Sequence, residues 1–320
     1  MLLIIDGNNL AHRVKYKFSL SNRGVDVSIT YGCLRSISSL ISKFKPQSLM
    51  VCWDGGTPEF RRQLLPEYKA NRTKGDPYEY QEFIRQVQEL HEIFPLMGIV
   101  SVRKRGAEAD DLMYHASKLY SGHSVIVTTD KDLYQAINPN VEVYSPTKGI
   151  IIDQSAVLEE YGVRTIGDLV HLRALMGDSS DNIRGVPGIG QKTAVKLFKE
   201  FGSLVGIVNA ALGCNPLQKW FYHTKVGDSI VAVGLDKISK TVAATTLHAD
   251  RVGAKAAILD AICDFQKADK DSTKRYLMRN AFESLWSSPK FLGGISKLVK
   301  PEVIDGIIKT PVVCGKRESV

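Results

Sequence analysis

The stretch Leu2-Leu3-Ile4-Ile5-Asp6 decides how the rest of the chain is interpreted. Its apolar residues predict a buried strand, and a buried strand that ends in Asp places the carboxylate at the carboxyl edge of a sheet. Two later runs have the same form, because Ser48–Trp53 precedes Asp54 and Val125–Thr129 precedes Asp130. Ligands bind at this edge in open α/β sheets. The three runs therefore predict a sheet that carries carboxylates along its ligand-binding edge.

Strand-like and helical segments alternate along the first half of the chain. We expect strands near 2–5, 48–53, 99–103, 124–129 and 141–144. We expect helices near 29–43, 79–93, 109–120 and 154–161. This alternation predicts an α/β fold with a doubly wound, mostly parallel sheet. After about Leu169 the strand pattern stops, and we expect the chain to about Trp286 to form a smaller helical domain.

The composition is that of an ordinary globular protein with a moderate excess of positive charge. The 320 residues are 44% hydrophobic and 24% charged, with a formal net charge of +8. This charge alone neither favours nor excludes a nucleic-acid-binding protein. The five cysteines are scattered and lack C-x-x-C spacing, which argues against a disulfide framework or a zinc site and predicts a reducing, cytosolic compartment. We expect neither a membrane span nor a signal peptide, because the apolar runs are too short.

Nine carboxylates follow apolar runs or stand in short acidic clusters. They are Asp6, Asp54, Glu108, Asp110, Asp111, Asp130, Asp132, Asp178 and Asp181. A single Asp after a strand is usually a turn residue or a helix cap, but clustered acids repel one another unless a cation compensates them. Magnesium suits such a set, since it takes oxygen ligands, keeps waters and bridges phosphate oxygens. An acidic metal pocket in a basic protein predicts an enzyme that cuts a polyanion.

A glycine-rich hairpin, Gly185-Val186-Pro187-Gly188-Ile189-Gly190-Gln191-Lys192, lies between two helical patterns. One interpretation is an ordinary connection between helices. The other is a phosphate-binding turn, because glycines bring backbone N–H groups close to an anion and the following helix offers its amino end. We expect this hairpin to hold duplex backbone without reading its sequence.

A stretch rich in Gly, Pro, basic and aromatic residues, 55–80, interrupts the α/β pattern and contains Tyr68-Lys69-Ala70-Asn71-Arg72. A solvated surface loop is one interpretation of it. Alternatively, its cations orient a phosphodiester near the metal pocket and its tyrosines stack on unpaired bases.

Six ordered motifs then identify a family. They are Asp6-Gly7-Asn8-Asn9, Trp53-Asp54-Gly55-Gly56, Tyr68–Arg72, Ala107–Asp111, Thr129–Asp132 and Met176–Ile183, followed by the Gly185–Gly190 hairpin. Over about residues 1–205 the chain resembles the 5′-nuclease family of flap endonucleases and 5′–3′ exonucleases. It is most similar to the free-standing bacteriophage members and to the 5′-nuclease domain of bacterial DNA polymerase I.

The resemblance implies a role for each motif. One metal would be held by Asp6, Asp54, Glu108 and Asp110, with Asp111 between two sites, and a second by Asp130, Asp132, Asp178 and Asp181. The cofactor would be two or more Mg²⁺ ions, for which Mn²⁺ substitutes, and K⁺ would bind at the hairpin 185–190. Lys69, Arg72 and Asp111 would be catalytic. The implied DNA contacts are Tyr68, Arg173, Gly185, Gly188, Gly190 and Lys192.

The resemblance also implies an arrangement of domains. Residues 1–168 would form an α/β nuclease core of PIN type, with a helical arch or clamp inserted at about 55–90. Residues 169–287 would form a helical DNA-binding domain whose hairpin, 185–190, belongs to a helix–hairpin–helix element. Residues 288–320 form a basic tail to which we assign no role.

The implied function is a structure-selective 5′ nuclease, both a 5′–3′ exonuclease and a flap endonuclease, that acts in DNA replication and repair by a two-metal mechanism. Its partner would be DNA with a 5′ single-stranded flap or a 5′ end at a duplex junction. Two alternatives stay open: removal of RNA primers from RNA–DNA hybrids, and non-catalytic binding of branched DNA. We expect a monomer, without membrane attachment, in the cytoplasm of a bacterial or phage-infected cell.

Overall fold

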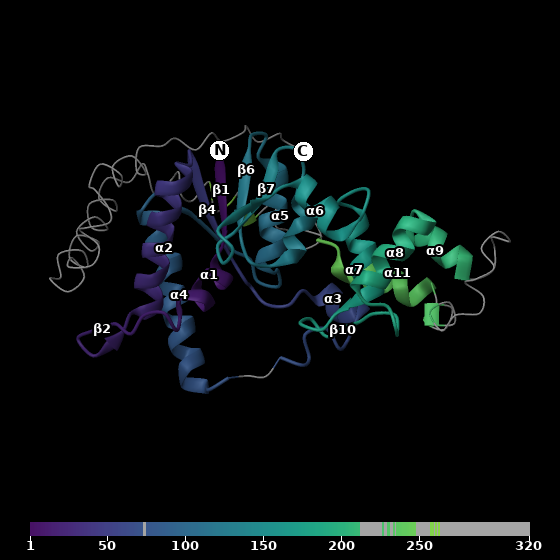
Figure 1. Cartoon of the computed structure of the whole chain (residues 1–320). Helices are drawn as coiled ribbons and strands as arrows, with labels where there is room; N and C mark the ends of the chain where they lie inside the picture. Colours follow the sequence, from purple (N-terminus) through teal and green to yellow (C-terminus); the bar gives the residue numbers. More distant parts are fainter. Residues whose placement is uncertain are drawn as a thin grey trace. The chain divides into compact units, whose positions relative to one another are not determined.

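The computed structural model describes residues 1–72, 75–211 and 235–247, and a few helical positions between 226 and 262. These residues divide into two compact units, each built from separate segments of the chain (Figure 1). Unit 1 contains the described residues of 1–56, 74–129 and 249–320, and unit 2 contains those of 57–73 and 130–248. The boundary predicted at 168/169 stays a prediction, and the predicted tail, 288–320, lies outside the described residues.

Unit 1 is built on four parallel strands. β1 (Leu2–Asp6) lies between β4 (Ser48–Trp53) and β6 (Ser124–Val127), and β5 (Val100–Arg103) pairs with the other edge of β4. Every residue of β1 is buried. A strand covered on both faces must be apolar throughout, which explains the unbroken run at the start of the chain. The predicted parallel sheet is confirmed.

Helices cover this sheet. α1 (Gly7–Val14) packs on β4 and α2 (Ser28–Phe44), α4 (Pro77–Leu96) packs on α2 and β5, and α5 (Ala109–Leu119) packs on β1, β4 and β6. In Figure 1 the helices α2 and α4 lie on one side of β1 and β4, and α5 lies on the other. The sheet is therefore wound on both faces, as the alternating pattern predicted.

A tryptophan at the end of β4 organises the contact between sheet and helices. Trp53 is 1% exposed, its ring stacks on Phe94 of α4 with centroids 6.0 Å apart, and its Nε1 donates to Ser101 Oγ over 2.9 Å. A Cβ on Gly7 would lie 2.5 Å from the same ring. Only glycine therefore lets α1 begin this close to the sheet, directly after Asp6.

The predicted insertion at about 55–90 divides between the two units. Its first part contains α3 (Glu59–Leu64) and belongs to unit 2. Its second part, from Pro77 onward, is most of α4, whose side chains Phe83, Val87 and Leu90 are buried. The range predicted for an arch thus includes a helix of unit 1, because the apolar face of α4 packs on α2 and β5.

Unit 2 is mostly helical and contains, besides α3, the 3₁₀ helix η1 (Lys131–Ala136). Its strands form two antiparallel pairs, β7 (Val141–Ser145) with β8 (Ile150–Ile152), and β9 (Gly177–Asp178) with β10 (Ile183–Arg184). Its further described helices are α6 (Gln154–Tyr161), α7 (Asp168–Met176), α8 (Gln191–Phe201), α9 (Leu204–Ala211) and α11 (Leu235–Thr245). The helix α7 packs on η1, α8 and α11, and α11 also packs on α3.

The prediction that strands end at Leu169 is corrected by β9 and β10. Gly177 has a φ of +77°, which turns the chain sharply at the end of α7. A Cβ on Gly185 would lie 2.2 Å from the Met176 carbonyl carbon, so the two ends of the pair approach without room for a side chain. Two-residue strands produce no alternating pattern in the sequence, and the signal was therefore absent.

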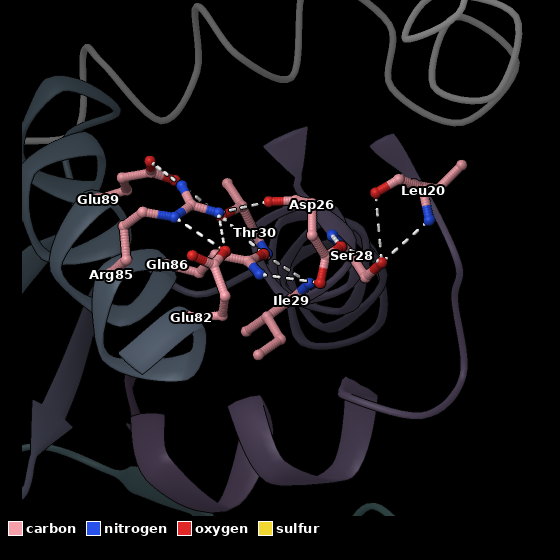
Figure 2. Close-up of polar contacts among 9 residues, drawn as sticks. All are labelled: Leu20, Asp26, Ser28, Ile29, Thr30, Glu82, Arg85, Gln86 and Glu89. Atoms are coloured by element: carbon pink, nitrogen blue, oxygen red, sulfur yellow. Dashed lines mark hydrogen bonds and ion pairs between the residues drawn. The ribbon is translucent and has the colours of Figure 1, made fainter. Parts of the chain in front are cut away.

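A polar cluster in unit 1 joins the amino end of α2 to α4 and to a short hairpin of β2 (Ser21–Asn22) and β3 (Val25–Asp26), as Figure 2 shows. The fully buried Gln86 accepts from the N–H groups of Ile29 and Thr30 over 2.9 and 3.1 Å. No side chain of the N-cap residue Val27 does so. The Asp26 carboxylate accepts from the amide and hydroxyl of Ser28. A residue from another helix thus satisfies donors that a helix start leaves unpaired.

The substitution Gln86→Leu keeps the size of the side chain and removes this acceptor. We expect it to lower the free energy of unfolding by on the order of 2 kcal/mol, because two buried N–H groups lose their partner. Gln88→Leu, at an exposed position of the same helix, is the control and should change stability by no more than about 0.5 kcal/mol. Urea unfolding followed by circular dichroism measures both. Equal stabilities of the two variants would contradict this account.

Candidate active site

The end of β1 places the first carboxylate. Asp6 is 6% exposed; its Oδ1 accepts from the Asn9 N–H over 2.9 Å and so caps α1, and its Oδ2 accepts from the Thr128 hydroxyl over 2.9 Å. Thr128 follows β6, the neighbour of β1. The carboxylate is therefore oriented by the ends of two adjacent strands.

Asp54 follows β4, the other neighbour of β1. Its N–H donates to Asn8 Oδ1 over 2.9 Å, and its Oδ1 accepts from the Ala109 N–H, at the start of α5, over 2.8 Å. Arg103 Nε donates to the Asp54 carbonyl over 3.0 Å. The exposed Asp54 thus connects the ends of β4 and β5 with the amino end of α5, where a negative charge is favourable.

The acidic cluster 108–111 begins α5. Glu108 is 5% exposed and Asp111 is fully buried, whereas Asp110 is partly exposed. Asp6 and Asp110 lie close enough to Cys52 to contribute, after burial, to a raised pKa of its thiol. The ends of β1 and β4 and the start of α5 therefore gather negative charge within unit 1, as the sequence predicted.

Unit 2 holds the other four predicted ligands. Asp130 precedes η1, and its Oδ1 accepts from the Asp132 N–H over 2.8 Å. Arg173 of α7, predicted as a DNA contact, forms ion pairs with Asp132 and with Asp178 Oδ2, the latter over 3.2 Å. Its guanidinium therefore lies among carboxylates and neutralises part of their charge.

The pKa values of two of these acids move in opposite directions. Burial is the largest cause that raises the pKa of Asp130; the charges of Asp181 and Asp178 add to it, and those of Arg173 and Lys69 oppose it. Burial also disfavours the charged form of Asp178, but hydrogen bonds from Ser180 and the charge of Arg173 outweigh it and lower the pKa. Asp178 is thus held as a carboxylate, while Asp130 carries the cost of like charges nearby.

The segment 67–72 is docked on the loop 178–182 of the same unit. Around Asp181, the Tyr68 hydroxyl donates to Oδ2 over 3.0 Å, Arg72 Nη2 donates to Oδ1 over 2.9 Å, and Lys69 Nζ lies 3.7 Å from Oδ2. Backbone contacts accompany these: Lys69 N–H to Asp181 O, Asn71 Nδ2 to Ser179 O, and Asn182 Nδ2 to Glu67 O, over 2.8, 2.9 and 2.8 Å. The structure therefore brings the predicted catalytic cations Lys69 and Arg72 together with one predicted ligand.

Backbone strain marks the same contact. Lys69 and Asn182 have φ values of +55° and +56°, in the left-handed region that residues other than glycine rarely adopt. Each such residue costs on the order of 1 kcal/mol and persists where surrounding contacts hold it. The hydrogen bonds between 67–72 and 178–182 are the contacts that hold Lys69 and Asn182 in this conformation.

The predicted hairpin lies between α7 and α8. Val186 and Ile189 are buried, whereas Pro187, Gly188 and Gly190 are exposed. The Val186 N–H donates to Leu175 O over 2.8 Å, and Gly188 turns the chain with a φ of +82°. No side chain caps α8, and Lys192 is exposed in its first turn. Apolar residues thus anchor the turn and leave its glycines and the helix start accessible to an anion.

Some residues at these sites received no role in the sequence analysis. Asn8, Thr128, Asn71 and Asn182 each make one of the hydrogen bonds that position a predicted site residue or its loop. Asn8, Asn71 and Asn182 stand inside the recognised motifs, so their place beside the carboxylates and cations was a usable signal. Thr128 offered only its position two residues before Asp130.

Within the part of the chain that the structure describes, no three His, Cys, Asp or Glu side chains form a group that would hold a metal ion as they lie. The chemistry of the donor set nevertheless fits a hard divalent cation, since every predicted ligand is a carboxylate and Asp6, Glu108 and Asp111 are buried. Buried carboxylates are costly without a compensating charge. The ligand assignment stays a prediction.

Within the described residues, no helix is both long and apolar enough to cross a membrane.

Two family models match the chain, over residues 1–162 and 165–257. They describe the N-terminal resolvase-like domain and the C-terminal SAM fold of 5′-3′ exonucleases. The chain belongs to the 5′-3′ exonuclease family.

Named relatives agree with this membership. A 5′-3′ exonuclease of Buchnera aphidicola subsp. Baizongia pistaciae is 37% identical over 214 residues, which make up 65% of this chain and 68% of the relative. The thermostable DNA polymerase I of Thermus thermophilus is 36% identical over 212 residues, 65% of this chain and 25% of the polymerase, so the chain spans about a quarter of that protein. A solved structure of the T5 5′-exonuclease with bound divalent metal ions (zinc) has a TM-score of 0.66 at 26% identity, and the match covers 83% of this chain and 97% of that one.

Gly55 determines how closely the loop after β4 approaches the loop before α5. Its N–H donates to Ala107 O over 2.8 Å, and a Cβ there would lie 1.6 Å from the Lys104 carbonyl oxygen. We expect Gly55→Ala to lower the free energy of unfolding by about 2 kcal/mol or more, because backbone must move to make room. Gly75→Ala, where a Cβ meets no atom within 4 Å, is the control. Thermal unfolding compares the two, and a fully stable Gly55→Ala would refute the close approach.

Proposed function

We propose that this protein is a metal-dependent, structure-selective 5′ nuclease that hydrolyses DNA phosphodiesters, as a 5′–3′ exonuclease and a 5′-flap endonuclease. Family membership supports the reaction class, and the names of the Buchnera and T5 relatives describe exonucleases. The observation that carries the proposal is the juxtaposition of Lys69 and Arg72 with Asp181, together with Asp130 and Asp178, whose charges act on the same group of residues. Hydrolysis of a phosphodiester needs acidic residues to hold metal ions and cations to bind the phosphate.

We assign the carboxylates to divalent ions. In unit 1 the ligands would be Asp6, Asp54, Glu108, Asp110 and Asp111, and in unit 2 they would be Asp130, Asp132, Asp178 and Asp181. The chemistry that bound divalent ions supply is activation of a water molecule and stabilisation of charge on the scissile phosphate. Mg²⁺ is the expected ion and Mn²⁺ a substitute, because both take oxygen ligands. The T5 relative, with its bound zinc, supports a divalent ion in general.

Lys69 and Arg72 would orient the scissile phosphate. Lys69 is 15% exposed and Arg72 is 58% exposed, so the first is a fixed charge near the carboxylates and the second reaches into solvent. A cation held in place before the reaction stabilises charge that develops in the transition state more than charge in the bound substrate. Lys69 therefore has the larger expected effect on turnover.

The hairpin would hold the duplex. Its exposed glycines and the amino end of α8 offer N–H groups to a phosphate, and exposed Lys192, Lys196 and Lys199 line the helix that follows. The proposed K⁺ site is the same turn, 185–190. Such contacts read backbone and not sequence, so selectivity would come from the shape of the DNA junction.

The proposed substrate is DNA with a 5′ flap or a 5′ end at a junction, cut by a monomer in the cytoplasm. Buried Cys33 and Cys52, both free thiols, agree with a reducing compartment. RNA–DNA hybrids are the second candidate substrate, and rates on matched RNA and DNA 5′ strands separate the two. Binding of branched DNA without cleavage is the non-enzymatic alternative.

The decisive experiment is cleavage of a labelled 5′-flap DNA by the purified chain with and without Mg²⁺. We expect cleavage only with the metal, and we expect Asp178→Asn with Asp181→Asn to abolish it, because the ligands of one ion are lost while flap binding stays measurable. The double variant Asp153→Asn with Asp168→Asn is the charge-matched control. It removes two acids of the same unit that lie at the starts of α6 and α7 and are not predicted metal ligands. Undiminished cleavage by the first double variant would exclude these ligands from the mechanism.

Lys69→Ala separates catalysis from binding. We expect kcat to fall by about 100-fold or more while flap affinity changes by only a few fold, since a preorganised charge acts mainly in the transition state. Single-turnover cleavage and an anisotropy titration in Ca²⁺ give the two quantities. An equal loss in both would make Lys69 a simple anchor for the substrate.

A further inference from the structure

Tyr68 is buried against the loop that carries Asp181. Its side chain is 6% exposed, and its hydroxyl donates to Asp181 Oδ2 over 3.0 Å. Tyr68 was predicted to contact DNA, but a base stacks only on an accessible ring face. The burial and the hydrogen bond instead direct the residue toward the carboxylate.

We propose that Tyr68 is a positioning residue that orients the Asp181 carboxylate for a divalent cation. The inference rests on the proposed function, because it takes Asp181 as a metal ligand. Groups that hydrogen-bond to a ligand fix its direction and set its basicity, so they act on metal binding without touching the metal.

The backbone on both sides of this hydrogen bond is already fixed. Lys69 N–H donates to Asp181 O over 2.8 Å, and Asn182 Nδ2 donates to Glu67 O over 2.8 Å. These contacts hold the main chain of 67–72 against that of 178–182, even though Lys69 and Asn182 adopt strained positive φ values. The freedom that is left to Asp181 is rotation of its side chain, which only donors to the carboxylate itself restrict.

Tyr68 is the better-placed donor of the two that bind Asp181. Arg72 reaches Oδ1 over 2.9 Å, but its side chain is 58% exposed, so solvent screens and loosens the ion pair. The Asp181 side chain is 13% exposed and Tyr68 is less exposed still. Hydrogen bonds in such surroundings are less screened and therefore more directional.

The Tyr68 ring is held in turn by a buried arginine. Arg61 of α3 is 2% exposed, its guanidinium lies 5.9 Å from the Tyr68 ring centroid, and its Nε donates to Ala244 O, near the end of α11, over 3.1 Å. Lys69 Nζ lies 5.0 Å from the same ring centroid. A guanidinium tied to another helix restricts the ring, and through the ring the hydroxyl, so the donor is preorganised.

The carboxylate keeps capacity for a cation. A carboxylate accepts at about four positions; Tyr68 and Arg72 occupy one on each oxygen, and Lys69 Nζ lies 3.7 Å from Oδ2, beyond hydrogen-bond distance. The hydroxyl therefore acts beside a metal ion and does not compete with it for the last acceptor position.

The test is Tyr68→Phe, which removes the hydroxyl and keeps the ring. Mn²⁺ binding to the full chain, followed by electron paramagnetic resonance of free Mn²⁺, should weaken by about 10-fold or more at one site. Binding of a 5′-flap DNA without divalent ions should stay within about twofold. Tyr16→Phe, at a tyrosine that is 80% exposed, is the control and should leave both unchanged.

A double-mutant cycle distinguishes positioning from a general structural role. If Tyr68 acts through Asp181, adding Tyr68→Phe to Asp181→Asn should cause no further loss of Mn²⁺ affinity. Additive losses would overturn the proposal, as would unchanged Mn²⁺ binding in Tyr68→Phe. A loss of DNA affinity with unchanged Mn²⁺ binding would make Tyr68 a DNA contact instead.

The outcomes also separate this inference from the proposed function. A chain that binds Mn²⁺ with the expected dependence on Tyr68 but cleaves no flap would refute the nuclease and leave the positioning role standing. If the wild-type chain cleaves flaps but the Tyr68→Phe variant binds Mn²⁺ as the wild type does, the nuclease would stand and the positioning role would be refuted.

Discussion

Parallel pairing of β1 with β4 on one side and β6 on the other is the constraint on which unit 1 depends. The register sets Leu2 opposite both Ser48 and Ser124, so the three strands run level and end together. Asp6, Asp54 and Thr128 are then neighbours because of where their strands stop. Since β1 is buried on both faces, a shift along its partners in one direction would place apolar Ile5 at the edge, and a shift in the other would draw Asp6 into the sheet and bury its charge. The apolar core and the position of the acidic edge are therefore one and the same requirement.

Helix capping and metal binding are compatible roles for these acids. Asp6 caps α1 with Oδ1, and Asp130 accepts the Asp132 N–H at the start of η1 with Oδ1. A bond from a main-chain N–H fixes the direction of the carboxylate and uses one of about four acceptor positions. The interpretation of such an Asp as a turn or cap residue is thus correct for the contact and leaves room for the proposed metal-binding role. In that role the cap would hold the carboxylate at a defined angle to the backbone.

The sequence predicted best what depends on contiguous residues. The strands at 48–53 and 141–144 and the helices at 109–120 and 154–161 were confirmed because buried strands and amphipathic helices have a local pattern. It could not predict that Tyr68 is buried on Asp181, since 113 positions separate the two and only the tertiary fold brings them together. Composition left 55–80 open as a solvated loop or as a stretch whose tyrosines stack on bases, and it does not indicate which ring is buried.

Opposite pKa directions at Asp130 and Asp178 show what the acidic set of unit 2 costs the fold. A carboxyl whose pKa is raised in the folded protein holds its proton to higher pH than in the unfolded chain, so stability falls as pH rises through that interval. Asp178, with its lowered pKa, contributes in the opposite sense and loses its contribution as the solution becomes acidic. Burial and the neighbouring charges of Asp181 and Asp178 raise the pKa of Asp130. A divalent cation among these carboxylates would oppose both causes, because it favours the charged form of every nearby carboxyl. The acids that repel one another in the protein alone are therefore the ones from which the proposed cation would draw the largest gain, and in that proposal the fold gives up stability for affinity.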